Sequence, residues 1–224
     1  MRAGTSDSEK KKKILEGARA IFLREGVSTI TMAQIAARQG ISKKTLYKYF
    51  SNKTQLVEEA IEEQIAAIAG LVDSIMLDRS QSFPQRLGRI FGIVARQLAQ
   101  LGETFIRDVF YREPRLWERI DHFRREHIFA AIMRLFEEGI RDGYVRTDIE
   151  SRLVPTLLVS AASAILSPAQ FFTLTAPPAV VFETFIKILL GGVLTEEGRT
   201  QLFSAQSSPA AGGSARGTTS EVEE

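Results

Sequence analysis

The chain has 224 residues, of which 44% are hydrophobic and 25% charged, as in a soluble globular protein with one large or two modest domains. It contains no cysteine, which excludes disulfides, thiolate metal ligands and a cysteine nucleophile. The net charge is +2, but residues 1–56 carry 12 Lys and Arg against 4 Asp and Glu, whereas residues 57–224 carry 17 against 23. This contrast of +8 with −6 favours a polyanionic partner for the amino-terminal part, unless its lysines simply face water.

The amino terminus has a lysine run at residues 10–13 that leads into an amphipathic pattern, not into the apolar segment of a signal peptide. Those lysines either follow a nucleic-acid groove or only keep this end of the chain soluble. No apolar run reaches the about 20 residues that a bilayer span requires. We therefore expect a cytoplasmic protein without a membrane segment.

The first helix is expected over about residues 8–25, followed by Gly26 as a left-handed stop. Its apolar positions recur with helical spacing: Ile14, Ala18, Ile21 and Phe22. A second, short helix begins after Thr31, because Gln34 stands three residues later in the spacing of a capping box. Gly40 ends that helix, since glycine adopts a positive φ without a Cβ clash.

A third helix starts after Ser42 and buries Leu46 and Phe50, which stand four residues apart. Asn52 repeats the capping pattern for a fourth helix over about residues 53–77. The apolar positions of that fourth helix also share one face: Leu56, Ala60, Ile61, Ile65 and Ile68. Two short helices joined by a glycine turn are the pattern of a helix-turn-helix.

The pattern stays helical beyond residue 70. Pro84 lies in the first turn of one helix, and Pro114 opens another that reaches about Gly139. Two further helices are expected at 149–170 and 178–194. The sequence contains no β-alternating run of useful length, so it predicts an all-α protein. The predicted parts are a basic helix-turn-helix head at 1–56, a helical ligand-binding and dimerisation domain at 57–203, and a disordered tail at 204–224.

The outward positions of the third helix carry groups suited to a DNA groove: Lys43, Lys44, Thr45, Tyr47, Lys48 and Tyr49. Lysines donate to guanine or to phosphates, the Thr45 methyl suits a thymine methyl, and tyrosine hydroxyls reach phosphates. Thr31 and Lys53 stand at the starts of the second and fourth helices, where backbone N–H groups favour an anion. One of the two tyrosines could instead pack on the first helix, and the lysines could form an ordinary solvated face.

The segment from Ile14 to Leu56 resembles the amino-terminal domain of the tetracycline-repressor (TetR) family of bacterial transcription regulators. Four stretches carry the resemblance: ILEGARAIFLREG, TITMAQIAARQGIS, TLYKYFSNK and TQLVEEA. It implies an all-α homodimeric repressor with a variable carboxy-terminal ligand domain. It also implies operator contacts from the matching positions: Thr31, Ser42, Lys43, Lys44, Thr45, Tyr47, Tyr49 and Lys53. The rest of the chain resembles the family only in outline, so the class of ligand does not carry over.

The helices expected at 149–170 and 178–194 are apolar nearly all round, which requires that they be buried. Burial against a second copy of the chain would make a homodimer. Its two symmetric recognition helices would read a palindrome in double-stranded operator DNA. Burial within a single chain is the alternative.

The stretch 105–136 is rich in large side chains, which either line ligand cavities or fill cores. Four of them are candidates for binding an unidentified small-molecule effector: Phe105, Trp117, Phe129 and Met133. His122 and Glu126 have helical i, i+4 spacing, but two ligands make a weak metal site, and we expect neither a metal nor any other cofactor. There is no nucleotide-binding glycine motif and no nucleophile elbow, so we expect no catalytic residues and no enzyme.

Together these features predict a ligand-responsive DNA-binding transcriptional regulator, a repressor that leaves a palindromic operator when a small molecule binds. Two alternatives remain. A ligand-independent architectural DNA-binding protein would discriminate weakly among sequences and lose affinity steeply with salt. A small-molecule-binding protein without a DNA role would bind its ligand but show no preference for a palindrome.

Overall fold

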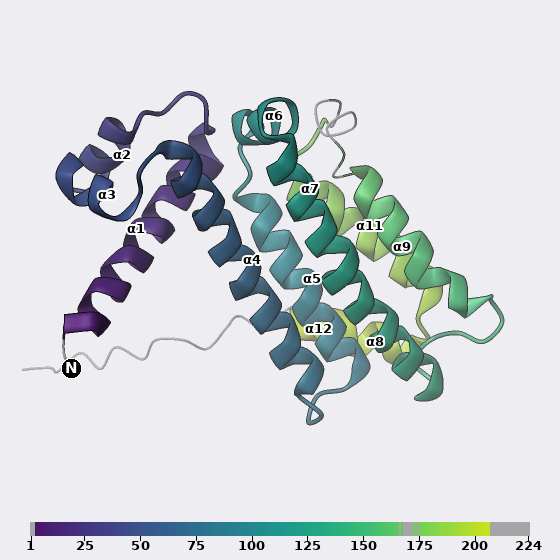
Figure 1. Ribbon diagram of the computed structural model, residues 1–224. Coiled ribbons are helices and arrows are strands. Elements are labelled where there is room, and N and C mark those ends of the chain that lie inside the picture. Colours follow the sequence, from purple (N-terminus) through teal and green to yellow (C-terminus); the bar gives the residue numbers. More distant parts are fainter. Residues whose placement is uncertain (1–2, 166, 168–172, 174, 207–224) are drawn as a thin grey trace, which may run out of the picture.

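The computed structural model describes residues 3–165, 167, 173 and 175–206. In that part of the chain the regular structure is helical, apart from one isolated antiparallel bridge between Val145 and Leu194. The helices form a small head and a larger body, and one long helix, α4, runs from the head along the body (Figure 1). The all-α prediction is confirmed. None of the described helices is long and apolar enough to span a bilayer.

The head follows the predicted order of caps and turns. Thr31 accepts a bond from the backbone N–H of Gln34, whose side chain accepts one from the Thr31 backbone N–H, so the predicted capping box is present. Gly26 and Gly40 have φ values of 90° and 66°, the left-handed conformation that ends a helix without strain in glycine. The helices of the head have these bounds: α1 (Ala3–Glu25), α2 (Met32–Arg38) and α3 (Lys43–Tyr49).

One apolar core joins the head to the beginning of α4 (Lys53–Leu77), as the Asn52 cap predicted. The large side chains that are fully buried there are Phe22, Ile35, Leu46, Phe50 and Leu56. The same core includes Phe105 from α6 (Glu103–Arg112) and Leu116 from α7 (Pro114–Phe123). The head therefore packs directly on this end of the body, and the predicted division at residue 56 falls within α4.

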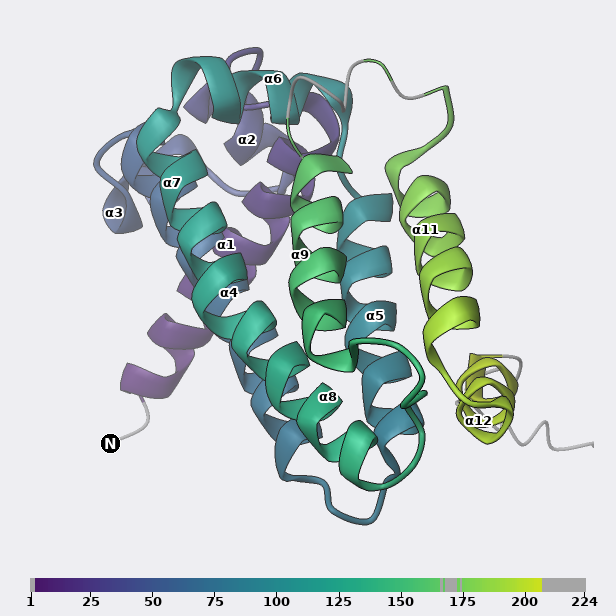
Figure 2. The same cartoon turned by 90° about the vertical axis from the view of Figure 1, so that its right-hand side faces the viewer.

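A second apolar core lies inside the body. Its central helix is α5 (Phe83–Ala99), which has Pro84 in its first turn as predicted and packs against α4, α8, α11 and α12. The large side chains that are fully buried there are Phe83, Leu87, Ile90, Leu135, Phe136, Leu158 and Leu190. α9 and α11 pack against each other at one side of the body (Figure 2). The other helices of the body are α8 (Ala130–Arg141), α9 (Val154–Ile165), α11 (Pro178–Val193) and α12 (Glu196–Gln206).

The helix predicted from Pro114 to about residue 139 is continuous, but it contains a π-helical segment, Arg124–Phe129, between α7 and α8. Arg124 and Arg125 both pair with Asp121 on the turn before this segment. The His127 ring stacks on the Phe123 ring, with 5.5 Å between centroids. These contacts have the i, i+3 and i, i+4 spacing of an ordinary α-helix, so the sequence pattern does not mark the widened turn, and it was not predicted.

The carboxy-terminal helices differ in extent from the prediction. A 3-10 turn, Ser151–Leu153, precedes α9, which starts with Pro155 in its first turn, whereas a helix over 149–170 was expected. Part of that range, residues 166 and 168–170, lies outside the described residues. α11 agrees with the predicted 178–194.

α12 was not predicted as a helix. Its Leu202 is fully buried against α5, so tertiary packing supports a segment with few apolar residues of its own. α12 extends to Gln206, three residues into the predicted tail at 204–224, and residues 207–224 lie outside the described part of the chain.

Candidate nucleic-acid interface

α3 has one buried face and one exposed face. Leu46 and Phe50 are fully buried in the head core, as the i, i+4 spacing predicted. On the other side Lys43 and Lys44 are exposed, and Tyr47 has 52% of its surface accessible. Such exposure leaves both the ring and the hydroxyl of a tyrosine free to meet a partner. Tyr47 therefore belongs to the outward face, not to the packing against α1.

The hydroxyls predicted to meet DNA also start their helices. The Ser42 hydroxyl accepts a 3.0 Å bond from the Thr45 backbone N–H and lies 2.8 Å from the Thr45 hydroxyl. The Thr31 hydroxyl accepts from the Gln34 backbone N–H at 3.3 Å and donates to the Gln34 side-chain oxygen at 2.9 Å. These capping bonds are a structural role for Thr31 and Ser42. Contacts with DNA from these hydroxyls stay a prediction.

The end of α3 is joined to the second turn of α1 through Asp7. Lys48 Nζ donates to Asp7 Oδ1 at 2.8 Å, and the Tyr49 hydroxyl donates to the same oxygen at 2.5 Å. Hydrogen bonds from Lys48 and Tyr49 hold the pKa of Asp7 below its usual value, and the Asp7 carboxylate raises the pKa of both partners. Tyr49 is half-buried and packs against the head core, so this tyrosine has the packing role that Tyr47 lacks.

Asp7 was not predicted as part of this surface. It stands 41 residues before Lys48, and no periodic pattern in the sequence connects the two. The one signal in the sequence is the scarcity of acidic residues in the head, which has four of them and a net charge of +8. Asp7 is one of these four, and it contacts α3.

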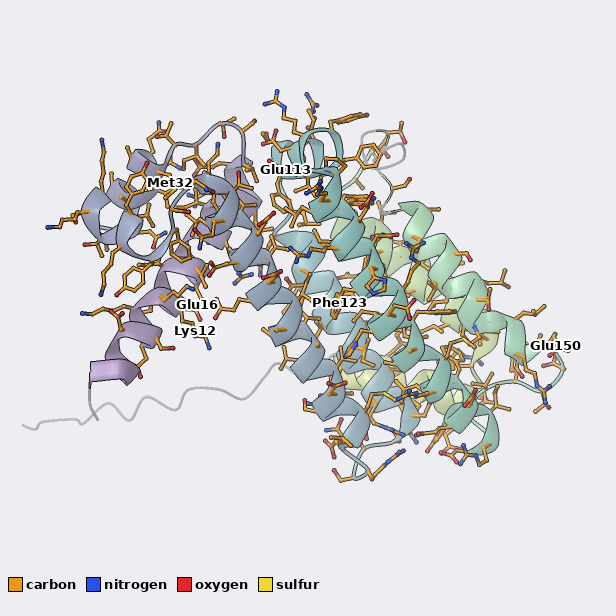
Figure 3. The ribbon with its side chains drawn as sticks, in the orientation of Figure 1. Lys12, Glu16, Met32, Glu113, Phe123 and Glu150 are labelled. Carbon is orange, nitrogen blue, oxygen red and sulfur yellow. The ribbon has the colours of Figure 1, made fainter. Side chains whose placement is uncertain are left out.

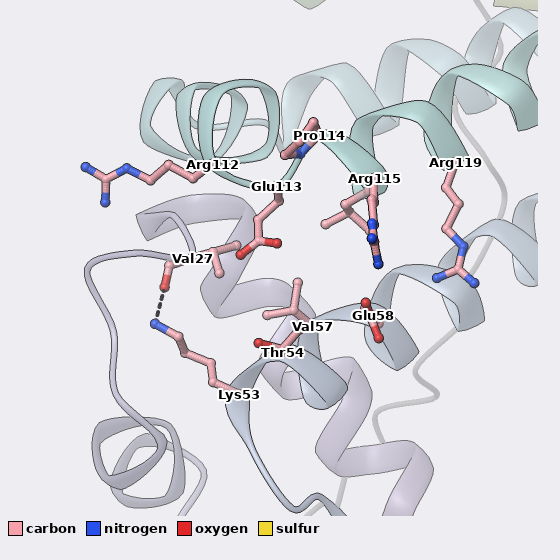
Figure 4. A pocket seen from close by; sticks show the side chains of 11 residues that line it. Val27, Lys53, Thr54, Val57, Glu58, Arg112, Glu113, Pro114, Arg115 and Arg119 are labelled. Carbon is pink, nitrogen blue, oxygen red and sulfur yellow. Dashed lines mark hydrogen bonds between the residues drawn. The ribbon is translucent and has the colours of Figure 1, made fainter.

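Lys53, at the start of α4, is half-buried and holds the loop between α1 and α2. Its ammonium donates to the carbonyl oxygens of Val27 at 3.0 Å and Ile30 at 3.1 Å. The bond to Val27 is drawn in Figure 4. An ammonium has three donors, so one remains for a phosphate. The structural role of Lys53 is visible here, and its DNA contact stays a prediction.

The described residues line a junction cavity and a distal cavity. The junction cavity, of about 580 Å³, lies between the start of α4 and the turn from α6 to α7, where Glu113 marks the end of the body beside the head (Figures 3 and 4). Its lining consists of Val27, Lys53, Thr54, Val57, Glu58, Arg112, Glu113, Pro114, Arg115, Leu116 and Arg119. The distal cavity, of about 740 Å³, is lined by Arg79, Ser80, Gln81, Ser82, Phe83, Arg86, Glu138, Arg141, Asp142 and Tyr144.

The four candidates for effector binding line neither of these cavities. Phe105 is 3% exposed inside the head core, and Trp117 packs against the same core with its ring edge-on to Phe110 at 5.5 Å between centroids. Phe129 and Met133 are half-buried farther along the chain. Their role in ligand binding stays a prediction.

The two histidines do not form a metal site within the described residues. His122 is exposed, and His127 Nε2 lies 3.4 Å from an Asp73 carboxylate oxygen. A structural metal needs about four ligands. In the part of the chain that is described, no three residues of the metal-binding types come together.

The capped helix α2, the glycine turn and the outward lysines and tyrosine of α3 define the chain as a helix-turn-helix protein of the DNA-binding class. The family model of bacterial regulatory proteins of the tetR family matches residues 14–60. The nucleoid occlusion factor SlmA of Vibrio vulnificus (strain YJ016) is 31% identical over 178 residues, which cover 66% of this chain and 90% of that relative.

Other relatives and solved structures extend the likeness to the body. The uncharacterized HTH-type transcriptional regulator YvaF of Bacillus subtilis is 24% identical over 83% of this chain and 96% of its own length. The HTH-type transcriptional repressor KstR of Mycolicibacterium smegmatis is 26% identical over 56% of this chain and 63% of its own length. A TetR-family regulator from Marinobacter aquaeolei VT8 has the same fold, with a TM-score of 0.63 and 24% identity. The match covers 88% of this chain and 97% of that structure's chain.

The chain belongs to the tetR family of bacterial regulatory proteins and is a helix-turn-helix transcriptional regulator. The family resemblance noted in residues 14–56 is thus confirmed. Regulators of this family are not enzymes, in agreement with the prediction from the missing catalytic motifs.

Proposed function

We propose that this regulator represses transcription by binding a palindromic operator as a homodimer, and that a small molecule releases it. The exposed face of α3 carries the proposal, because Lys43, Lys44 and Tyr47 stand outward from a helix that Leu46 and Phe50 hold in the core. Regulators of the family bind operator DNA, and the relative KstR is named a repressor. Further contacts in this proposal come from Thr31, Ser42, Thr45, Lys48, Tyr49 and Lys53.

The homodimer is supported by apolar side chains exposed on the outer helices of the body. Leu157 of α9 has 58% of its surface accessible, and Val180 and Ile188 of α11 have 49% and 74%. A group of large apolar side chains exposed on two adjacent helices is typical of an interface between proteins. Two copies related by a two-fold axis would present two α3 helices to the halves of one palindrome.

Release by an effector is proposed to act through α4, which belongs to both cores. Leu56 near its start lies in the head core, and Ile75 near its end lies in the body core. The junction cavity lies between α4 and α7, so a molecule bound there would contact both parts. A ligand that prefers one orientation of the head shifts the population toward it, and a change from mostly bound to mostly free needs about 5.5 kcal/mol of differential affinity.

Selection of duplexes from a random-sequence library by the full-length protein tests the operator proposal. We expect an enriched motif with two-fold symmetry, half-sites about 10 base pairs apart and two copies of the chain bound. A motif without symmetry, or no enrichment, would contradict the dimeric repressor. A compound that binds at saturation yet leaves the affinity for the selected duplex unchanged would contradict release by that compound.

The relative SlmA favours a second candidate function, because its name describes a nucleoid occlusion factor and not a ligand-responsive repressor. In this second candidate the chain is a DNA-binding protein that acts without an effector. This candidate predicts no change of DNA affinity with any small molecule. If binding were also architectural, affinities for selected and shuffled duplexes would be similar and would fall steeply with salt.

A further inference from the structure

We propose that Asp7 is a specificity-determining residue of the head, because its carboxylate occupies two DNA-binding groups of α3 until a fitting operator displaces it. The groups are the Lys48 ammonium and the Tyr49 hydroxyl, so the inference rests on the proposed function of α3 as the recognition helix. Asp7 would favour operator over random DNA by making non-specific contacts weaker.

The geometry makes Asp7 a competitor of a DNA phosphate. A single oxygen, Oδ1, accepts the bond from Lys48 at 2.8 Å and the bond from Tyr49 at 2.5 Å. A phosphate oxygen accepts bonds from ammonium and phenol groups in the same way. The side chains of Lys48 and Asp7 are 61% and 50% exposed, so an approaching phosphate can reach the pair.

Asp7 is brought to α3 by a helix that is held in place. Lys11 stands one helical turn after Asp7, on the same face of α1. Its ammonium pairs with Glu59 of α4 at 2.7 Å and lies 5.5 Å from the centre of the Phe50 ring. The carboxylate therefore stays beside α3 as part of the head and does not move freely on a loose arm.

The competition affects random and fitting DNA differently. An exposed ion pair contributes little stability in water, so a phosphate held in contact by a well-docked operator can replace the carboxylate. A random duplex is held mainly by long-range attraction to the basic head, and it docks α3 less closely. In that loose complex Lys48 stays paired with Asp7, so the protein makes one phosphate contact fewer than it would without the carboxylate.

The test compares Asp7→Asn with Glu9→Gln in the full-length protein. Glu9 is an exposed acid on the same helix, two residues and therefore more than half a turn away, so its variant removes the same charge without touching α3. The probes are a selected duplex and a shuffled duplex of equal composition, each titrated over a range of salt. We expect Asp7→Asn to bind the shuffled duplex about fivefold more tightly at low salt, with little change on the selected duplex.

The salt dependence identifies the contact. For the shuffled duplex, the slope of log K against log salt should steepen by about 0.9 in Asp7→Asn, the value for one added phosphate contact. Glu9→Gln should change both duplexes alike and by less. In a Lys48→Met background, Asp7→Asn should lose most of its effect, because the coupled partner is gone.

Three results would overturn the proposal. Equal increases in affinity for the shuffled duplex in Asp7→Asn and Glu9→Gln would show a general charge effect. Weaker operator binding by Asp7→Asn would show that Asp7 orients the α3 side chains for DNA. Unchanged binding of the shuffled duplex by Asp7→Asn would show that Asp7 does not keep Lys48 from contacting DNA. If selection yields no motif, the repressor proposal fails, while the shuffled duplex still decides whether Asp7 competes.

Discussion

The backbone N–H of Ser28 donates a 2.7 Å hydrogen bond to Oδ2 of Asp108, and this bond joins the α1–α2 loop of the head to α6 of the body. Asp108 is 3% exposed. Gly26 packs so closely here that a Cβ at its position would lie 2.8 Å from the same oxygen. Because Arg112 Nε lies 3.8 Å from the other carboxylate oxygen, Asp108 connects the loop to a side chain that lines the junction cavity. The orientation of the head therefore depends on a partly buried polar contact as well as on the shared apolar core.

Replacement of Asp108 by Ala should destabilise the protein by about 1–3 kcal/mol, because the Ser28 N–H loses a charged acceptor in a partly buried hydrogen bond. Asp108→Asn keeps an acceptor oxygen and should therefore lose less stability than Asp108→Ala. The free energy of unfolding from urea titrations measures both effects. Asp142→Ala is the matched control, since Asp142 is exposed at the end of α8. If Asp108→Ala is as stable as this control, the contact with Ser28 does not stabilise the fold.

Replacement of Tyr47 by Ala should weaken binding to a selected duplex about tenfold or more while leaving the melting temperature almost unchanged. The reason is that Tyr47 is 52% exposed and stands on the outward face of α3. Tyr111→Ala is the control, because Tyr111 is 65% exposed on α6 in the body. A fall of several degrees in the melting temperature of the Tyr47 variant would assign this tyrosine to the core instead.

Stability at acid pH should depend on Glu138. Arg79 donates to one of its carboxylate oxygens at 2.7 Å, and Arg86, which is 4% exposed, donates to the other. Burial raises the pKa of Glu138, but the bonds from Arg79 and Arg86 outweigh burial and hold the pKa below the ordinary 4.5. A lowered folded-state pKa means that the stabilisation is complete above the unfolded pKa and is lost as the pH falls through the folded one.

The variant Glu138→Gln should therefore lose roughly 3 kcal/mol at neutral pH, because Arg86 stays buried without its carboxylate partner. The difference from the parent protein should shrink as the pH falls below 4.5, where the parent protein also loses the charge. Unfolding by urea between pH 7 and pH 3, roughly the range of carboxylate titration, measures this. The neighbouring exposed Glu137→Gln should show no such pH dependence. A constant difference at every pH would mean that packing, not charge, explains the loss.

The helices of the head were predictable because residues a few positions apart in the sequence determine where they start and end. Thr31 and Gln34 stand three residues apart, and Gly40 and Ser42 mark the turn and the next cap, so backbone requirements are visible in the sequence itself. The bounds of α4 followed from the Asn52 cap and one apolar stripe in the same way. The contacts of Asp7 with Lys48 and of Ser28 with Asp108 span 41 and 80 residues, and no local spacing predicts such pairs.

The body was less predictable because packing decides its details. Leu202 supports α12 by burial against α5, although the segment has a weak helical pattern of its own. Side-chain size also cannot separate a core from a cavity wall. Phe105 was chosen for its size and lies in the head core, whereas the charged Arg115 and Glu113 line the junction cavity.

The proposed dimer can be tested by placing a charge on its expected interface. Ile188 of α11 is 74% exposed, and Ile188→Asp should give a folded monomer, because a carboxylate buried between two copies lacks a partner. Leu77→Asp is the control, since Leu77 is 78% exposed at the end of α4. Sedimentation and circular dichroism measure mass and folding.

The monomeric variant should also lose affinity for a two-fold symmetric duplex by about 100-fold, because the second half-site is no longer bound by a linked copy. Its affinity for a single half-site should stay close to that of the parent protein, since Ile188 lies in the body and α3 is unchanged. A dimer of Ile188→Asp with full affinity for the symmetric duplex would place the interface elsewhere on the chain.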